Sequence, residues 1–318
     1  MNESTTNGKI DMVATAATLG ALCGWSLGPV FITYLTGYVD SWTQNALRYT
    51  VACLFWLPML LYFWRTGKLD RRTWYRAILP ALTNIAMQSI WARAFYYIGP
   101  AFLVLLSKTS ILWVTGFSLI FFRDERPLAR SGRFWVGLAL SLAGVFGVLY
   151  FKEDFSAAGT SIGIMIALVT GFMWAVYTLS VKVTLHDIDS RCGFSVISLY
   201  TSVGLWGCAW AFGAPQECMG MGVRPWAAVI FSAVTAIALA HVFYYAAVKR
   251  IGATIPVLVI LAQPFVVFGI SSVVFQERLS GLQLLFGLVL LAGSGLSVLA
   301  QRCLRPAPTE AEEPAKSG

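Results

Sequence analysis

Apolar stretches of about twenty residues recur along most of the chain and are separated by short polar segments. A transmembrane α-helix needs about 20 mostly apolar residues, whereas a barrel strand needs about half that number and alternates in character every second residue. No such alternation runs through these stretches. We therefore predict an all-α membrane protein with ten transmembrane helices, over residues 13–34, 41–62, 77–97, 100–122, 134–151, 162–181, 194–212, 226–248, 252–275 and 282–301.

The two ends of the chain are polar. Residues 1–12, an expected cytoplasmic segment, precede an apolar stretch that is too long for the core of a cleaved signal peptide. We therefore expect the first helix to remain in the mature protein. Residues 302–318 are rich in Pro, Ala and Glu and contain little that a folded core would bury, so we expect a disordered cytoplasmic tail.

The composition agrees with a membrane protein. Hydrophobic residues make up 58% of the chain and charged residues only 12%, about half the share in soluble domains. A net charge of +8 would suggest nucleic acid as a partner of a soluble protein, but here the basic residues lie mostly in short loops, so we expect no nucleic-acid partner. The six cysteines are scattered without metal-binding spacing, so no metal or other cofactor is expected.

The positions of the basic residues predict the orientation in the membrane. Most of them fall at the chain ends and in the loops after every second predicted helix, whereas the other loops contain only Lys152, Arg224 and Arg278. Loops rich in Lys and Arg remain in the cytoplasm. We therefore expect an integral, multi-pass protein with both termini cytoplasmic, in the inner (plasma) membrane of a bacterium.

Three short features occur in both halves of the chain. They are Trp25 and Trp174, Ile98-Gly99 and Ile251-Gly252, and Glu125-Arg126 and Glu277-Arg278. We infer two repeats of five helices, over residues 13–151 and 162–301. Because five is odd, the second repeat would enter the membrane inverted, an arrangement that places the substrate site of many secondary transporters near the midplane.

Several motifs resemble those of a known family. They are residues 171–182 (GFMWAVYTLSVK), residues 241–252 (HVFYYAAVKRIG), Pro256, Pro264 and Glu277-Arg278. Residues 12–301 resemble the EamA-type transporters of the drug/metabolite transporter superfamily. The resemblance implies ten helices, a central cavity lined chiefly by the first, third, fourth, sixth, eighth and ninth, and export or exchange of small molecules such as amino acids. In one respect the chain departs from the pattern: Pro264 precedes Glu277 by thirteen residues, but Leu112 stands thirteen residues before Glu125.

Lys108 is the most informative candidate for substrate binding. It lies about 12 Å along the predicted helix 100–122, near the membrane midplane, where an ammonium costs roughly 2.5–3.5 kcal/mol. No Asp or Glu lies within the ten predicted helices to offset that cost, so an anionic group of a substrate is a candidate partner. Backbone carbonyls or water are the alternative partners. Lys108 also resembles, by its position four residues before Leu112, a phosphate-recognising lysine of the triose-phosphate and nucleotide-sugar translocators.

Four further polar residues are candidates for substrate binding, namely Arg48, Arg93, Gln88 and His241. Arg48 and Arg93 are expected on the same side of the membrane as Lys108 and could attract anions there. Alternatively, Arg48 pairs with Asp40 or packs structurally, and Arg93 extends to the interface. His241 aligns with Gln88 of the first repeat and titrates near neutral pH when unperturbed, so it could couple transport to protons or simply be a hydrogen-bonded histidine of the bundle.

The remaining candidates are aromatic residues and an amide. Trp25, Trp174, Tyr177 and Tyr244 could form the walls of a substrate site, although aromatic residues of membrane proteins more often pack or lie at the interface. Prolines such as Pro29 and Pro264 free an upstream carbonyl, which is tolerated where the protein supplies a partner. Gln263, beside Pro264, could supply a polar contact to a substrate, and the alternative is that the prolines make purely structural kinks.

Together these features predict a secondary transporter, an exporter or exchanger of an amino acid or other organic anion, which works by alternating access. The sequence has no Walker A motif for ATP-driven transport. A non-transporting sensor or assembly module is the alternative. An intramembrane enzyme is less favoured, because the predicted helices contain one histidine and no carboxylate, and we predict no catalytic residues. The expected partners are a small-molecule substrate and membrane lipid, and a homodimer is left open.

Overall fold

The computed structural model describes residues 11–121, 126, 130–151, 158–185, 187–251, 256 and 259–300. Within these residues every regular element is a helix. The elements are α1 (Met12–Leu35), α2 (Ser41–Arg65), α3 (Arg71–Ala94), α4 (Pro100–Ser107), α5 (Ser110–Phe121), α6 (Gly132–Tyr150), α7 (Ala158–Thr184), α8 (Ser190–Phe212), η2 (Pro215–Gly220), α9 (Val223–Ser232), η3 (Ala233–Leu239), α10 (Ala240–Ile251), α12 (Gln263–Val274) and α13 (Gly281–Ala300).

Each of the ten predicted stretches overlaps a described helix, and eight helical stretches are long and apolar enough to cross a membrane. The third stretch, α3, is not among the eight, although it has 24 residues, and it carries four arginines. The ninth contains α12, which has 12 residues, and part of it lies outside the described residues. The number of ten crossings therefore stays a prediction. Residues 1–10 and 302–318 of the predicted polar ends are also outside the described part of the chain, as is residue 301 of the last predicted helix.

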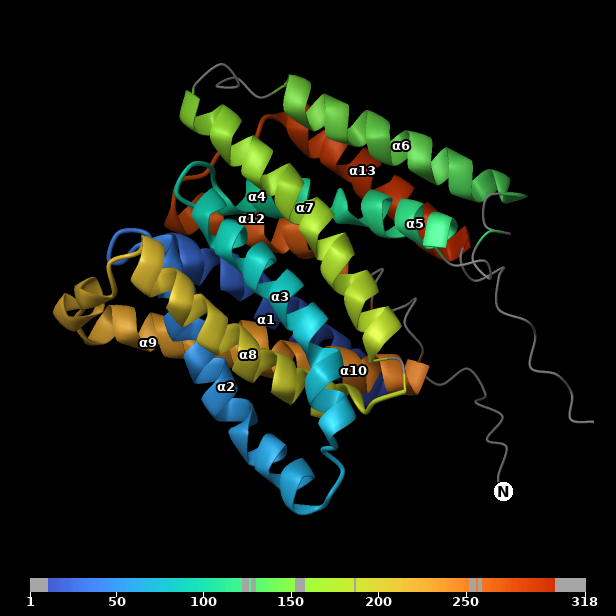
Figure 1. Cartoon of the computed structure of the whole chain (residues 1–318). Coiled ribbons are helices and arrows are strands. Elements are labelled where there is room, and N and C mark those ends of the chain that lie inside the picture. The colour runs from blue at the N-terminus through green and yellow to red at the C-terminus, as the bar shows by residue number, and fades with distance from the viewer. Residues whose placement is uncertain are drawn as a thin grey trace, which may run out of the picture.

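Helices from the two halves of the chain pack directly against each other. In Figure 1, α6 and α13 lie side by side along one edge, and α3 runs next to α7 and α8. In the rest of the bundle, α1 packs on η3 and α10, and α2 packs on α8. Because each of these pairs joins an early helix to a late one, the two halves form one interleaved bundle.

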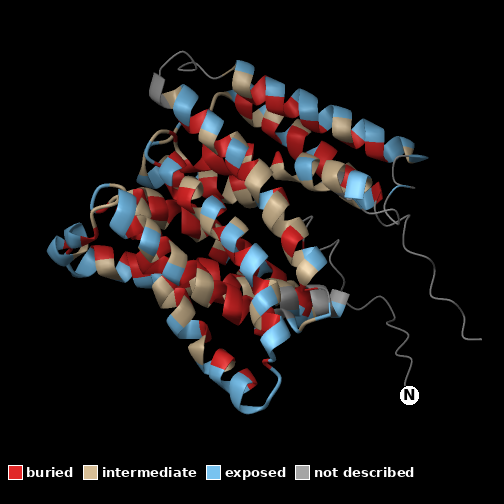
Figure 2. Ribbon diagram, viewed as in Figure 1, coloured by how far each residue is buried: buried red, intermediate tan, exposed pale blue. Residues whose placement is uncertain are grey.

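The outer faces of the bundle carry large apolar side chains. Figure 2 shows the buried residues gathered between the helices and the exposed ones on the outside. Among the exposed residues are Leu54, Phe146 and Trp210, which lie in the middle or last turns of apolar helices. A soluble protein rarely exposes so many large apolar side chains, so these faces are suited to contact with lipid.

Aspartates begin four of the long helices. The side chains of Asp11, Asp40, Asp70 and Asp189 accept hydrogen bonds from backbone N–H groups in the first turns of α1, α2, α3 and α8. Such N-caps satisfy donors that the helix itself leaves free. The carboxylate of Asp40 also accepts from the backbone N–H of Ala214 at 2.9 Å, which joins α2 to the segment after α8.

The predicted helix 100–122 is interrupted at Lys108 and Thr109, although no proline stands at position 112. The backbone N–H of Ile111 bonds to the carbonyl of Lys108 at 3.1 Å, three residues back rather than four. The same tightening occurs before α12, where the N–H of Phe265 bonds to the carbonyl of Ala262 at 3.1 Å. Tightened turns inside a helix often mark a hinge. The structure thus places an interruption at corresponding points of both halves.

A third irregularity lies between α9 and α10, where η3 is a π-helix. Gly24 of α1 packs against this segment, and a Cβ atom at Gly24 would lie 2.7 Å from the carbonyl oxygen of Thr235. Only glycine allows this close approach of the two backbones. The contact fixes α1 against the irregular segment one residue before Trp25.

Candidate functional site

The two interrupted helices meet through their side chains. Lys108 is the C-cap residue of α4, and Gln263 is the first residue of α12. The ammonium nitrogen Nζ of Lys108 donates a hydrogen bond to Oε1 of Gln263 at 2.8 Å. Among the described residues no carboxylate forms an ion pair with Lys108. The partner of this lysine is therefore a neutral amide.

The other end of the same amide binds the first helix. Nε2 of Gln263 donates to the backbone carbonyl oxygen of Trp25 at 2.8 Å. In a regular helix this carbonyl would accept from the N–H four residues later, but residue 29 is Pro29, which has no N–H. Gln263 therefore satisfies the carbonyl that Pro29 frees, and it links α1, the end of α4 and the start of α12.

Aromatic rings pack against the side chain of Trp25. The indole of Trp25 meets the imidazole of His241 edge to face at 5.3 Å, and it meets the ring of Tyr244 at 5.2 Å. The imidazole also stacks on Phe194 at 4.8 Å. His241 Nδ1 lies within hydrogen-bond distance of the carbonyl of Ile237. Because a carbonyl only accepts, Nδ1 carries the proton in this arrangement.

Five of the ten predicted site residues are thus brought together. We call Lys108, Gln263, Trp25, His241 and Tyr244 the central cluster. They come from α1, the α4–α5 interruption, α10 and α12, which belong to the first, fourth, eighth and ninth predicted helices. The cluster combines one cation, one amide and several rings, groups that are suited to bind a small molecule with an anionic group. Whether these residues bind substrate stays a prediction.

Arg48 lies in a different polar site. Its side chain is 3% exposed, and its Nε donates to Oγ of Ser232 at 3.0 Å, at the end of α9. Asp40, the alternative partner considered from sequence, is occupied with capping α2. One turn away, Oε1 of Gln44 is buried without a hydrogen-bond partner in the described structure. Arg48 is therefore a buried cation that lacks a described carboxylate partner.

The other predicted residues do not join the central cluster through the contacts described. Arg93 is exposed in the last turn of α3, as expected for a side chain that reaches the interface. The backbone carbonyl of Gln88 accepts from the side-chain amide of Asn45. Trp174 is 40% exposed on α7, and its ring contacts that of Tyr177 at 5.9 Å rather than that of Trp25.

Glu277 connects the two halves of the chain through hydrogen bonds. Its carboxylate accepts from the backbone N–H groups of Ala101 and Phe102 at 3.0 and 3.1 Å, and from Oγ of Ser271 at 2.6 Å. From the sequence, Glu277 was identified only as part of a repeated motif, and it was not predicted to cap a helix of the other half. The sequence does mark the start of α4, because Pro100 is typical of a first helical turn, whose N–H groups need a cap.

Thr109 was missed by the sequence analysis. Its hydroxyl is buried without a hydrogen-bond partner in the described structure, and the residue is 3% exposed. A Cβ atom on Gly171 of α7 would lie 2.8 Å from this hydroxyl. The interruption of the fourth predicted helix thus packs on α7, while that of the ninth is bonded to α1 through Gln263.

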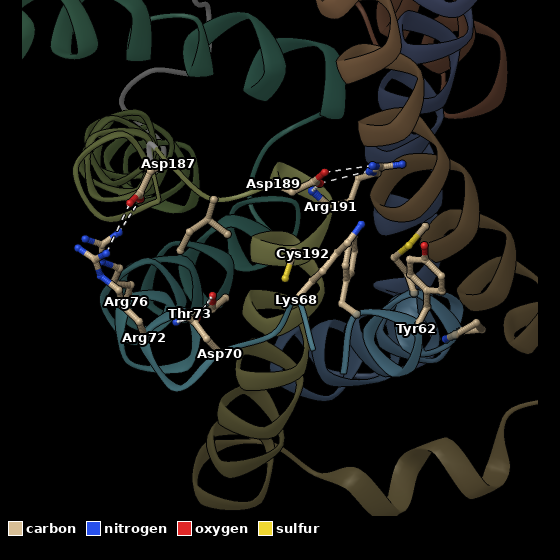
Figure 3. A pocket seen from close by; sticks show the side chains of 14 residues that line it. Tyr62, Lys68, Asp70, Arg72, Thr73, Arg76, Asp187, Asp189, Arg191 and Cys192 are labelled. Atoms are coloured by element: carbon tan, nitrogen blue, oxygen red, sulfur yellow. Dashed lines mark hydrogen bonds and ion pairs between the residues drawn. The ribbon is translucent and has the colours of Figure 1, made fainter. Parts of the chain in front are cut away.

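A cavity of about 680 Å³ lies away from the central cluster, at the turns between α2 and α3 and between α7 and α8. Figure 3 shows Arg76 facing Asp187, and Asp189 bonded to Arg191. The first pair joins α3 to the segment after α7. In the second pair the two residues are only two positions apart in the sequence. Most of the charged groups in this cavity are engaged with each other, which favours a structural contact between the halves.

A model of the EamA-like transporter family matches residues 12–150 and, separately, residues 161–299. The chain belongs to this family. It is therefore an integral, multi-pass membrane protein of the drug/metabolite transporter superfamily, whose members are transporters rather than enzymes. The double match also fits the two-repeat architecture, although the limits of the repeats stay a prediction.

A solved structure described as "Crystal structure of protein" resembles this EamA-like chain with a TM-score of 0.64. The two share 18% sequence identity, and the alignment covers 92% of this chain and 99% of the other. At this identity the likeness concerns the fold alone. No curated protein matches the sequence.

Proposed function

We propose that this EamA-like protein is a secondary transporter that exports or exchanges a small metabolite, such as an amino acid or other organic anion, by alternating access. The observation that carries the proposal is the hydrogen-bonded chain from Lys108 through Gln263 to the Trp25 carbonyl. It joins the interruptions of two membrane helices to a third helix at one place. Discontinuous helices near the midplane form the substrate sites of many secondary transporters.

The chemistry of the central cluster favours an anionic substrate. A buried ammonium is costly to keep in a membrane unless it is well paired, and Gln263 supplies only one neutral acceptor to its three donors. A carboxylate or phosphate oxygen would offset more of that cost, because it adds the attraction between opposite charges to the hydrogen bond. Trp25, His241 and Tyr244 would then pack against the rest of the substrate.

The proposed topology places both termini in the cytoplasm of a bacterium, with the two repeats inverted in its inner membrane. On this topology Asp11 and Arg250, whose ion pair measures 2.9 Å, tie α1 to α10 at the cytoplasmic end. Arg76 and Asp187 would tie the halves at the same end, and Glu277 would do so at the opposite end. Alternating access requires such contacts to break and re-form in turn, with the interruptions near Lys108 and Gln263 as hinges.

Transport by purified protein in liposomes tests the proposal. We expect accumulation of labelled amino acids or organic acids when the vesicles are preloaded with unlabelled compound, and loss of accumulation with Lys108→Met. Lys68→Met is the matched control, because Lys68 is an exposed cation in the α2–α3 turn. If no compound moved under any gradient, the protein would not be a carrier. A sensor or assembly module would also be insensitive to Lys108→Met.

A further inference from the structure

Gln263 occupies the position where an anionic substrate would bind Lys108. The oxygen Oε1 lies 2.8 Å from the lysine nitrogen, which is the distance expected for a carboxylate oxygen in a charge-assisted bond. We infer that Gln263 is an internal stand-in for the substrate anion, which displaces it from Lys108 during transport. The inference rests on the proposed function and adds to it a mechanism for selecting anions.

The side chain of Gln263 is held at both ends. Its oxygen accepts from Lys108, and its nitrogen donates to the Trp25 carbonyl, both at 2.8 Å. The usual partner of this carbonyl within α1, the N–H of residue 29, is absent because residue 29 is Pro29. The amide is therefore oriented with its oxygen toward the ammonium, and it cannot turn away without breaking one bond or both.

A substrate must compete with this oxygen for the same donor. The bond from Lys108 to Gln263 already has a charged donor. A carboxylate or phosphate adds the attraction between opposite charges, which is strong where water is scarce, so an anion can replace the amide oxygen on Lys108. An uncharged group offers no more than Gln263 already supplies. Gln263 thus excludes neutral ligands while leaving anions able to bind, and the empty carrier keeps its lysine paired.

Displacement would be transmitted to the backbone. Gln263 is the first residue of α12, and the turn before it is closed by the bonds of Ala262 and Phe265 to carbonyls three residues back. Tightened turns of this kind inside a helix often mark a hinge. Release of Gln263 by the substrate therefore frees α12 from Lys108 and from α1 together, which couples binding to movement of the halves.

Two substitutions at Gln263 separate this inference from a structural role. Gln263→Glu places a tethered carboxylate at the position proposed for the substrate, and Gln263→Leu removes the competing oxygen. Because Gln263→Leu also leaves the Trp25 carbonyl unpaired, it is made in addition with Pro29→Ala, which restores the helical N–H. Lys108→Met serves as the control that lacks the anion-binding group.

The measurement is the melting temperature of purified, detergent-solubilised protein titrated with acetate, propionate or inorganic phosphate, and with acetamide or propionamide as uncharged matches. We expect the anions, but not the amides, to raise the melting temperature of the unaltered protein. In Pro29→Ala/Gln263→Leu the half-saturating anion concentration should fall about tenfold relative to Pro29→Ala, which corresponds to loss of a competing hydrogen bond to a charged group. Gln263→Glu and Lys108→Met should show no anion effect.

Equal stabilisation of the unaltered protein and Gln263→Glu by anions would overturn the inference. So would an unchanged or higher half-saturating concentration in Pro29→Ala/Gln263→Leu. Anions that stabilise no variant would overturn it as well. In each of these cases the liposome assay decides separately whether the protein is a transporter, because accumulation that depends on Lys108 does not require displacement of Gln263.

Discussion

The side-chain nitrogen of Gln263 donates a hydrogen bond to the carbonyl oxygen of Trp25 at 2.8 Å, across a separation of 238 positions in the sequence. Pro29 leaves that carbonyl without its usual partner inside α1. In the apolar interior of a membrane protein an unpaired carbonyl costs several kcal/mol, so a proline there depends on a donor from elsewhere. Pro29 and Gln263 therefore act as a pair, although they belong to opposite halves.

The first prediction concerns this pair. Gln263→Leu should lower the free energy of unfolding by about 1–3 kcal/mol, because it leaves a buried acceptor unsatisfied. In a Pro29→Ala background the same substitution should cost less, since the restored N–H of residue 29 binds the Trp25 carbonyl. A double-mutant cycle by reversible denaturation in micelles would measure the coupling, expected at roughly 0.5–3 kcal/mol. Additive effects of the two substitutions would contradict the pairing.

The prolines and Lys108 were visible in the sequence because each breaks a local rule. A proline inside an apolar stretch frees a carbonyl, and a lysine near the midplane needs a partner. Gln263 was a candidate for a polar contact, but its pairing with Lys108 and with the Trp25 carbonyl was not visible. Helical periodicity tells which residues share a face but not which distant helix that face meets. Gln263 is separated from Lys108 by 155 positions. Gln263 becomes the common partner of Lys108 and of the carbonyl freed by Pro29 only through the packing of α12 against α1 and α4.

The interruption at Lys108 was not predicted either. The expected signal was a proline at the place that Leu112 occupies, yet the chain tightens there without one. The close contact between Thr109 and Gly171 shows that this segment is packed by another helix, an influence that local sequence does not reveal. Arg48 illustrates the same limit, because its partner is Ser232 of α9 rather than nearby Asp40.

The second prediction concerns the approach of α1 to the π-helix. Gly24→Ala should lower the free energy of unfolding by about 1–3 kcal/mol, because the added methyl would meet the backbone oxygen of Thr235 at 2.7 Å. Gly207→Ala is the matched control, since nothing lies within 4 Å of a Cβ atom at that position of α8. Thermal denaturation of both variants would measure the difference. Equal melting temperatures would mean that α1 shifts without cost.

The third prediction concerns the carboxylate that joins the halves. Glu277→Gln should destabilise the protein by about 1–2 kcal/mol, because a single amide oxygen would replace two charged oxygens at the start of α4. Arg278→Gln, a change at the exposed neighbouring residue, is the control. Denaturation of both variants checks the prediction. A Glu277→Gln protein as stable as Arg278→Gln would show that the cap contributes little.

The fourth prediction concerns acid pH and the aspartate caps outside the membrane. A hydrogen bond from the Thr73 side chain holds the pKa of Asp70 below its usual 3.8, and one from the Arg191 side chain does the same for the pKa of Asp189. A carboxyl with a lowered folded-state pKa stabilises the protein fully above its unfolded-state pKa. That contribution is lost as the pH falls through the lowered value.

Asp70→Asn/Asp189→Asn tests this dependence, because asparagine also caps helices but does not titrate. Melting temperatures measured from pH 6 down to pH 2 should fall more steeply for the unaltered protein than for the double variant. The steeper fall should begin near pH 4, where these carboxyls begin to bind protons in the unfolded state but are still charged in the folded state. Parallel melting curves would show that these caps are too well solvated to contribute, since both aspartates lie at exposed positions.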